Sequence, residues 1–199
     1  MTRSPVTLRC AKPSDATVLA ELWGEVLRRA DHADQVADLV TVIERAEAAR
    51  DQRLVVAEYD GNLAGAVHLQ VTTMTPINLE PTVLAVSPHV LPSFRRHGVG
   101  SALIDAAVSF AEEQGINHIA TAAAAGSRDA NRFMARLCFG PQAVLRVAST
   151  HVVRGKLNAI RRPSGQRTTG RSGRQITQVL AARRSQRRSQ SATTGDLSG

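Results

Sequence analysis

The chain has 199 residues, of which 43% are apolar and 21% are charged, and this is enough for one domain with a hydrophobic core. No apolar run approaches the roughly 20 residues that a membrane-spanning helix needs, and residues 1–5 lack the apolar stretch of a signal peptide. We therefore expect a cytoplasmic protein without membrane contact. Cys10 and Cys138 are too few for a disulfide framework and lack the paired spacing of a zinc site, so we interpret both as packing residues and expect no bound metal.

The net charge of +8 is concentrated at one end of the chain. Residues 1–153 carry 14 Lys and Arg against 16 Asp and Glu, whereas residues 154–199 carry 11 against Asp196 alone, so the body is −2 and the tail is +10. From residue 161 to 199, Arg, Ser, Thr, Gly and Gln fill 30 of 39 positions, which leaves too little apolar surface to offset the entropy of ordering. We expect a folded domain at residues 1–155 and a basic, disordered tail at 156–199, in which residues 176–188 form a short helix only on a partner.

The first 70 residues contain signals for a strand, two helices and a hairpin, in that order. Residues 6–10 alternate as a strand, and Pro13-Ser14-Asp15 is a start signal for an amphipathic helix that continues to Leu27. A second helix follows, and its apolar face consists of Val36, Leu39, Val40 and Ile43. Residues 54–59 and 63–70 are typical of two strands, and the Asp60-Gly61 turn between them predicts a β-hairpin.

The next part of the chain alternates strands with helices. Residues 82–90 are expected to form a strand in which Pro88 causes a bulge or a splay, because proline has no N–H to pair. A helix follows at residues 98–114 and ends at Gly115, then a strand at 116–122. We expect a short helix at residues 129–137 whose inward side chains are Phe133, Met134 and Leu137, and a last strand at 143–153. This order predicts a mixed α/β fold.

The segment from Val90 to Ser101 reads VLPSFRRHGVGS and carries the strongest chemical signal. A strand ends, a basic segment with two glycines follows, and a long helix begins. The free N–H groups of a first helical turn and the positive end of its dipole favour an anion, and Gly98 and Gly100 let the backbone approach a phosphate closely. Positive charge at the rim of this loop comes from Arg95, Arg96 and His97.

This segment resembles the pyrophosphate loop of the GNAT superfamily of acyl-CoA N-acyltransferases. The family pattern V-x-P-x-(Y/F)-R-x-x-G-x-G is met at Val90, Pro92, Phe94, Arg95, Gly98 and Gly100. The hairpin with Asp60-Gly61 and Gly65 lies where the family has its own, and residues 127–139, SRDANRFMARLCF, are similar to the late family segment N-x-x-A-x-x-L-Y-x-x-x-G-F. The resemblance covers residues 6–153.

The resemblance implies a mixed, mostly antiparallel sheet with a splayed central strand pair, flanked by helices. It also implies transfer of an acetyl group from acetyl-CoA to a primary amine by direct attack in a ternary complex. The pantetheine arm of coenzyme A would lie between the splayed strands, the N–H of Val90 would serve the oxyanion, and the helical pair before the hairpin and the strand after residue 143 would line the acceptor side. The residues expected to contact the cofactor are His89, Val90, Arg95, Arg96, His97, Gly98, Val99, Gly100, Ser101 and Ser127.

Three departures from the family pattern bear on catalysis. The tyrosine that often protonates the leaving thiolate falls on Met134, which has no proton to donate, and the only tyrosine of the chain, Tyr59, lies in the early hairpin. The family asparagine falls on Ser127 and a family glycine on Cys138, a change that we interpret as one of packing. Loss of one general acid slows such a reaction by about 10²–10⁴ without abolishing it.

The reaction also needs a base, because an alkylamine with a pKa of about 10 is mostly protonated at neutral pH. The catalytic candidates are Glu80, His89 and Ser127. Each has a structural alternative: Glu80 as a solvated loop carboxylate, His89 as a cover for its strand, and Ser127 as a helix-start residue. His68 and His118 are interpreted as packed strand residues.

Two other functions stay open at this point. Met134 in the acid position favours a regulatory module that binds acyl-CoA without turnover. The +10 tail favours a protein associated with nucleic acid or another polyanion through its phosphates, although the tail has no aromatic residue for base stacking.

Overall fold

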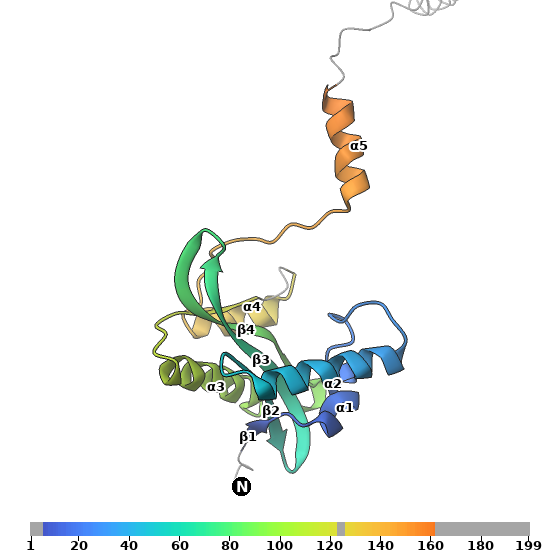
Figure 1. The fold of residues 1–199 in the computed structure, drawn as a ribbon. Coiled ribbons are helices and arrows are strands. Elements are labelled where there is room, and N and C mark those ends of the chain that lie inside the picture. Colours follow the sequence, from blue (N-terminus) through green and yellow to red (C-terminus); the bar gives the residue numbers. More distant parts are fainter. Residues whose placement is uncertain (1–5, 123–125, 162–199) are drawn as a thin grey trace, which may run out of the picture. The chain divides into compact units, whose positions relative to one another are not determined.

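The structure is a computed structural model and describes residues 6–122 and 126–161 (Figure 1). The chain divides into two compact units, Met1–Val144 and Leu145–Gly199. The first contains β1 (Thr7–Cys10), a 3-10 turn (Pro13–Asp15), α1 (Ala16–Leu22), α2 (His32–Ala48), β2 (Gln52–Tyr59), β3 (Asn62–Thr75), β4 (Asn78–Val90), a second 3-10 turn (Pro92–Phe94), α3 (Val99–Glu113), β5 (Ile119–Thr121) and α4 (Arg128–Arg136). The second contains α5 (Thr150–Arg161). The helix predicted at residues 176–188 lies outside the described residues.

The five strands form one sheet in the order β1-β2-β3-β4-β5. All neighbours are antiparallel except β4 and β5, which run parallel. The β2–β3 hairpin turns at Asp60 and Gly61, whose φ angles of 50° and 73° suit the turn that matches the twist of the strands. The predicted mixed, mostly antiparallel sheet and its hairpin are thus confirmed.

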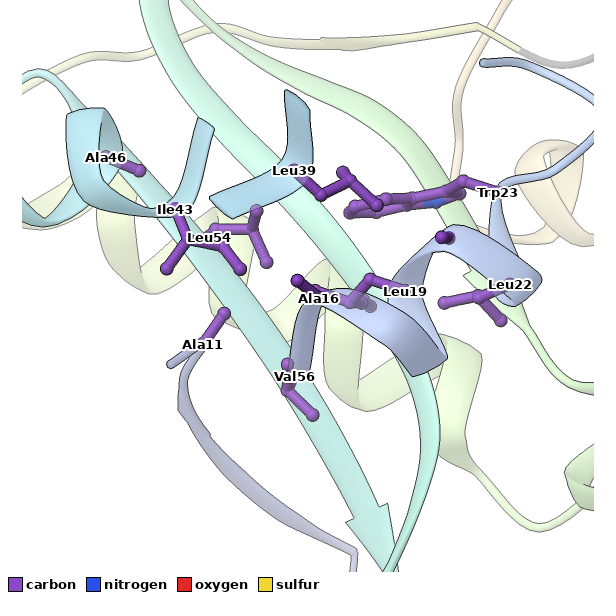
Figure 2. Close-up of a cluster of buried hydrophobic side chains, with 12 residues drawn as sticks. Ala11, Ala16, Leu19, Leu22, Trp23, Leu39, Ile43, Ala46, Leu54 and Val56 are labelled. Carbon is purple, nitrogen blue, oxygen red and sulfur yellow. The ribbon is translucent and has the colours of Figure 1, made fainter. Parts of the chain in front are cut away.

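The two faces of the sheet are covered by different helices. On one face, α1 and α2 pack on Leu54 and Val56 of β2 and Ala66 of β3, and Figure 2 shows the ring of Trp23 against Leu39 in this cluster. On the other face, α3 packs on alternate residues of the same strands, among them Val55, Ala57, Val67 and Leu69. Alternation along β2 and β3 therefore sends neighbouring side chains to opposite cores, as the strand period of two requires.

The parallel pair β4–β5 is short. Pairing extends only over Val83–Ala85 on β4 and Ile119–Thr121 on β5, so the strand predicted at residues 116–122 is shorter than expected. Beyond Ala85, β4 pairs with β3 alone in the part of the chain that the structure describes. Within residues 6–122 and 126–161, one side of β4 therefore has no strand partner between Val86 and Val90, and we call it the open side of β4.

The prediction of a strand at residues 143–153 is wrong. Residues 141–149 have no regular structure, and Thr150 begins the helix α5. The prediction treated Val152 and Val153 as the end of a strand, whereas they begin a stripe that continues at helical spacing through Leu157 and Ile160. No residue of α5 is buried, and none of the helices in residues 6–122 and 126–161 is long and apolar enough to cross a membrane.

Two further expectations, on which side chains of α4 and which cysteines are buried, are wrong. Phe133 and Met134 of α4 are only half-buried, and Leu137, expected to face inward, is exposed. Cys10 and Cys138 are both exposed, so neither is a packing residue. Cys138 has instead a backbone role, because its φ of 63° lies in the left-handed region that glycine adopts without strain.

Candidate functional site

Strand β4 bulges where Pro88 predicted an interruption. The pairing with β3 shifts from His68 opposite Val86 to Ala66 opposite His89, and Ser87 has a φ of 46°. The indole Nε1 of Trp23, at the end of α1, donates a 2.9 Å hydrogen bond to the carbonyl oxygen of Ser87. The bulge is thus held from the face that α1 and α2 cover, and Trp23 does more than fill the core.

After the bulge, β4 returns to close contact with β3 at Gly65. A Cβ at Gly65 would stand 2.6 Å from the carbonyl oxygen of His89 and 3.1 Å from a methyl of Val99 at the start of α3. Only glycine leaves room for this approach. Gly65 therefore sets how closely the end of β4 and the start of α3 lie over β3.

The alternation of hydrogen bonds shows which way the backbone of Val90 points. The N–H of Leu91 donates to the carbonyl oxygen of Ala64 at 2.9 Å, so these two residues form a hydrogen-bonded pair. In an antiparallel ladder the next pair, Gly65 with Val90, is then a non-hydrogen-bonded one. The N–H and C=O of Val90 consequently point away from β3, toward the open side of β4.

The loop after β4 turns sharply into α3. Arg96 and Gly98 have φ angles of 70° and 89°, and Gly98 stands just before the first residue of the helix. The amide of Ala102 donates to the carbonyl oxygen of Gly98 at 3.0 Å, and no side chain caps Gly98. By helix geometry, the three amides before Ala102 point out of the start of α3 and have no acceptor within the helix, an arrangement that favours an anion. We call residues 95–101 the anion loop.

Basic side chains at the anion loop are exposed. Within the described residues, neither Arg95 nor Arg96 forms an ion pair, and His97 contacts the carbonyl oxygen of Arg95 through Nδ1 at 2.9 Å. The ring of Tyr59 lies 4.8 Å from that of His97 and 6.1 Å from that of Phe94, centroid to centroid. The only tyrosine of the chain therefore supports the anion loop, a position that the sequence pattern did not indicate.

Ser127 caps the start of helix α4, and Phe133 of this helix lies beside the first turn of α3. The Ser127 hydroxyl accepts a 3.4 Å hydrogen bond from the amide of Ala130, and its carbonyl oxygen accepts one of 2.7 Å from the Asn131 side chain. A Cβ at Gly100 would stand 3.4 Å from the ring of Phe133. Ser127 is thus a helix-start residue, and α4 brings Phe133 against the first turn of α3.

The candidate bases lie far apart. His89 is half-buried on β4 opposite Ala66, beside the bulge. Glu80 is exposed near the start of β4, where its Oε1 lies 3.4 Å from Nδ1 of His118, which is exposed rather than packed. At about 3.3 Å per residue, Glu80 stands roughly 30 Å along the strand from Val90.

A hollow in the structure lies away from the anion loop and the bulge of β4. A hollow of about 460 Å³ lies between the end of α2 and the start of β2, where Glu47, Arg50 and Arg53 line it, at the end of β2 away from Tyr59. In the ranges 6–122 and 126–161, no three His, Cys, Asp or Glu side chains are grouped closely enough to hold a metal ion.

Comparisons with known proteins agree on the fold. The model of the acetyltransferase (GNAT) family matches residues 18–139, and no curated protein sequence matches the chain. A transcriptional regulator from Bacillus halodurans C-125 is 21% identical, with a TM-score of 0.63 over 73% of this chain and 99% of its own. An aminoglycoside N-acetyltransferase solved with CoA is 19% identical, with a TM-score of 0.61 over 74% of this chain and 96% of its own. A Clostridium acetobutylicum protein described as a predicted acetyltransferase and solved with acetyl-CoA is 15% identical, with a TM-score of 0.57 over 72% of this chain and 96% of its own.

Proposed function

Because the chain belongs to the acetyltransferase (GNAT) family, we propose that it transfers the acetyl group of acetyl-CoA to a primary amine by direct attack in a ternary complex. When bound, acetyl-CoA supplies an acetyl group activated as a thioester. The two solved proteins named above with CoA or acetyl-CoA share the fold at 15–19% identity. The roles of individual residues in this proposal are argued from the geometry of this chain.

The anion loop has the features that a diphosphate needs. Three amides point out of the start of α3, Gly98 has nothing within 4 Å of the place of a Cβ, and Arg95 and Arg96 are not neutralised by an ion pair in the described part of the chain. Backbone donors at a helix start, with arginines beside them, suit a doubly charged phosphate group. The residues present therefore fit the pyrophosphate of coenzyme A, bound by residues 95–101.

The orientation of Val90 carries the proposal. Its N–H points to the open side of β4, because Leu91 and Ala64 form the neighbouring hydrogen-bonded pair. A fixed backbone donor at the place where negative charge develops on the acetyl oxygen stabilises the transition state more than the ground state. In this proposal Val90 is the oxyanion donor, and among the described residues no strand pairs with that side of β4 beyond Ala85.

Proton transfer is assigned to side chains around this strand. His89, beside the bulge, is proposed as a base for the amine. Glu80, roughly 30 Å along β4 from Val90, has no role in this step. Ser127 is proposed to contact the cofactor next to the anion loop. Met134 has no proton for the leaving thiolate, so water protonates it in this proposal.

Calorimetric titration with acetyl-CoA tests the binding site. We expect the wild-type protein to bind, and Gly100→Glu to weaken binding at least tenfold, because its carboxylate would stand at the start of α3 where the pyrophosphate lies. Ser109→Glu adds the same charge to an exposed position of α3, more than two helical turns away, and should bind as the wild type does. Absence of binding by the wild-type protein would refute the proposal.

A CoA-binding module without turnover is a second candidate, favoured by Met134 in the position of the family acid. Release of free thiol from acetyl-CoA across a panel of amines separates the two. Turnover with any amine excludes the second candidate, and binding without turnover across the panel excludes the first.

A further inference from the structure

His68 lies on the face of the sheet that α1 and α2 cover. Its chain neighbours Val67 and Leu69 are buried against α3, so alternation along β3 turns the imidazole to the opposite face. Directly across the ladders it stands opposite Leu54 of β2 and Val86 of β4. Val86 is the residue before Ser87, so His68 is the cross-strand neighbour of the bulge.

The imidazole of His68 is half-buried, and its Nε2 is fully covered. Among the described residues, Nε2 is the one buried side-chain nitrogen or oxygen without a hydrogen-bond partner. An unpaired buried polar atom destabilises a fold, so it calls for a functional or solvent partner. Burial lowers the pKa of His68 below its ordinary value and so favours the neutral ring, which has one nitrogen with a free electron pair.

Another histidine lies near His68 across the β3–β4 ladder. His89 stands opposite Ala66, two residues from His68 along β3 and on the same face, and diagonal positions of this kind lie about 7–8 Å apart. The apolar cluster on this face comes from α1, α2 and β2 and includes Trp23, Leu39, Ile43, Leu54 and Val56. Two histidines therefore flank the bulge on the side of α1 and α2.

We propose that His68 is a proton acceptor for the amine that this enzyme acetylates, an inference that rests on the proposed function. An alkylammonium group placed beside the bulge gives one N–H proton to Nε2, and its freed electron pair forms the C–N bond to the acetyl carbon. The C–S bond breaks and its electron pair leaves on the thiolate, which takes a proton from water. The second amine proton leaves the nitrogen as the amide forms, is taken up by His89, and replaces the proton that water gave to the thiolate. Because Nε2 is fully covered, the proposal requires a movement that uncovers it when the amine binds.

The test combines the pH dependence of thiol release with direct titration of the imidazole by NMR. In the wild-type protein, the acid limb of kcat/KM should follow the pKa of His68 measured by NMR, which should lie below 6.5. His68→Gln should lower kcat/KM at pH 7 by about 10²–10⁴ and recover as the pH approaches the pKa of the amine. His151→Gln, on the exposed helix α5, is the matched control and should keep the wild-type profile.

Each outcome of this test either supports or overturns the proposed role of His68. A purely structural role for His68 would lower kcat/KM by the same factor at every pH, and that result overturns the proposal. So does an acid limb that differs from the NMR pKa of His68, a comparison that needs only the wild-type protein and holds even where His68→Gln does not fold. If wild-type protein releases no thiol with any amine, the proposed function itself fails, and turnover with an unaltered His68→Gln profile overturns the His68 proposal alone.

Discussion

The indole of Trp23 and the carbonyl of Ser87 are joined by a 2.9 Å hydrogen bond across 64 positions of the chain. This bond connects α1 to the strand β4 where the ladder with β3 slips by one residue. A carbonyl turned out of a ladder at a bulge needs another donor, and Trp23 provides it from the core. The helix on the proposed acceptor side and the strand on the proposed cofactor side are therefore coupled through one bond.

Trp23→Phe keeps an aromatic ring and removes this donor. We expect a loss of about 1–3 kcal/mol in the free energy of unfolding, because the Ser87 carbonyl is left without its donor and the smaller ring leaves a void. Urea unfolding followed by circular dichroism measures it. Val26→Ala, at an exposed position just beyond α1, should change stability by less than about 0.5 kcal/mol. Equal stability of Trp23→Phe and wild type would show that the bond contributes nothing.

Gly65→Ala is expected to destabilise the fold more than the same substitution at a glycine that has free space around its Cβ position. The added Cβ would meet the His89 carbonyl oxygen at 2.6 Å, and the backbone of β4 has to move to relieve it, at about 1–3 kcal/mol. The same shift turns Val90, so the affinity for acetyl-CoA should also fall. Gly140→Ala is the control, since nothing lies within 4 Å of its Cβ position. Unchanged melting temperatures for both variants would contradict this prediction.

Helices α3 and α4 end in the same motif with different residues. At α3, Gly115 and Ile116 donate to the carbonyls of Glu112 and Ala111, and at α4 the corresponding donors are Cys138 and Phe139. Both Gly115 and Cys138 have positive φ angles, of 67° and 63°, and only glycine adopts them without strain.

Cys138→Gly should therefore stabilise the protein by about 1 kcal/mol, and Gly115→Ala should destabilise it by a similar amount. Thermal unfolding of the two variants measures both signs. Cys138→Ala removes the thiol and keeps the side-chain carbon, so it should match the wild type. A stabilisation as large in Cys138→Ala would attribute the effect to the thiol and not to the backbone.

The lowered pKa of His68 predicts how stability changes with pH. The unfolded chain takes up a proton at this residue as the pH falls through about 6.5, whereas the folded protein does so only at lower pH. The unfolded state then binds more protons, so this contribution to stability is full above pH 6.5 and is lost as the pH falls toward the lowered pKa. The unfolding free energy of the wild type minus that of His68→Gln should therefore be larger at pH 8 than at pH 5. A difference independent of pH would rule this out.

Features that depend on neighbouring residues could be predicted from the sequence. The Asp60-Gly61 turn, the helix between Gly98 and Gly115 and the bulge at Pro88 each follow from backbone chemistry at one place in the chain. The strand predicted at residues 143–153 failed because a few alternating apolar residues do not distinguish a strand from a helix until the stripe is followed further, to Leu157 and Ile160.

The sequence by itself determined the fold class, the family pattern and the place of the anion loop, since these rest on local spacing and turn chemistry. Only the tertiary structure decided which distant side chains meet: Trp23 at the Ser87 carbonyl, Tyr59 at His97, and His68 beside the bulge with Nε2 unpaired. These contacts join separate elements, and sheet register and helix packing set them. Local periodicity carries no information about the partner across a ladder, so the side chains around the proposed reaction centre become visible only once the strands are paired.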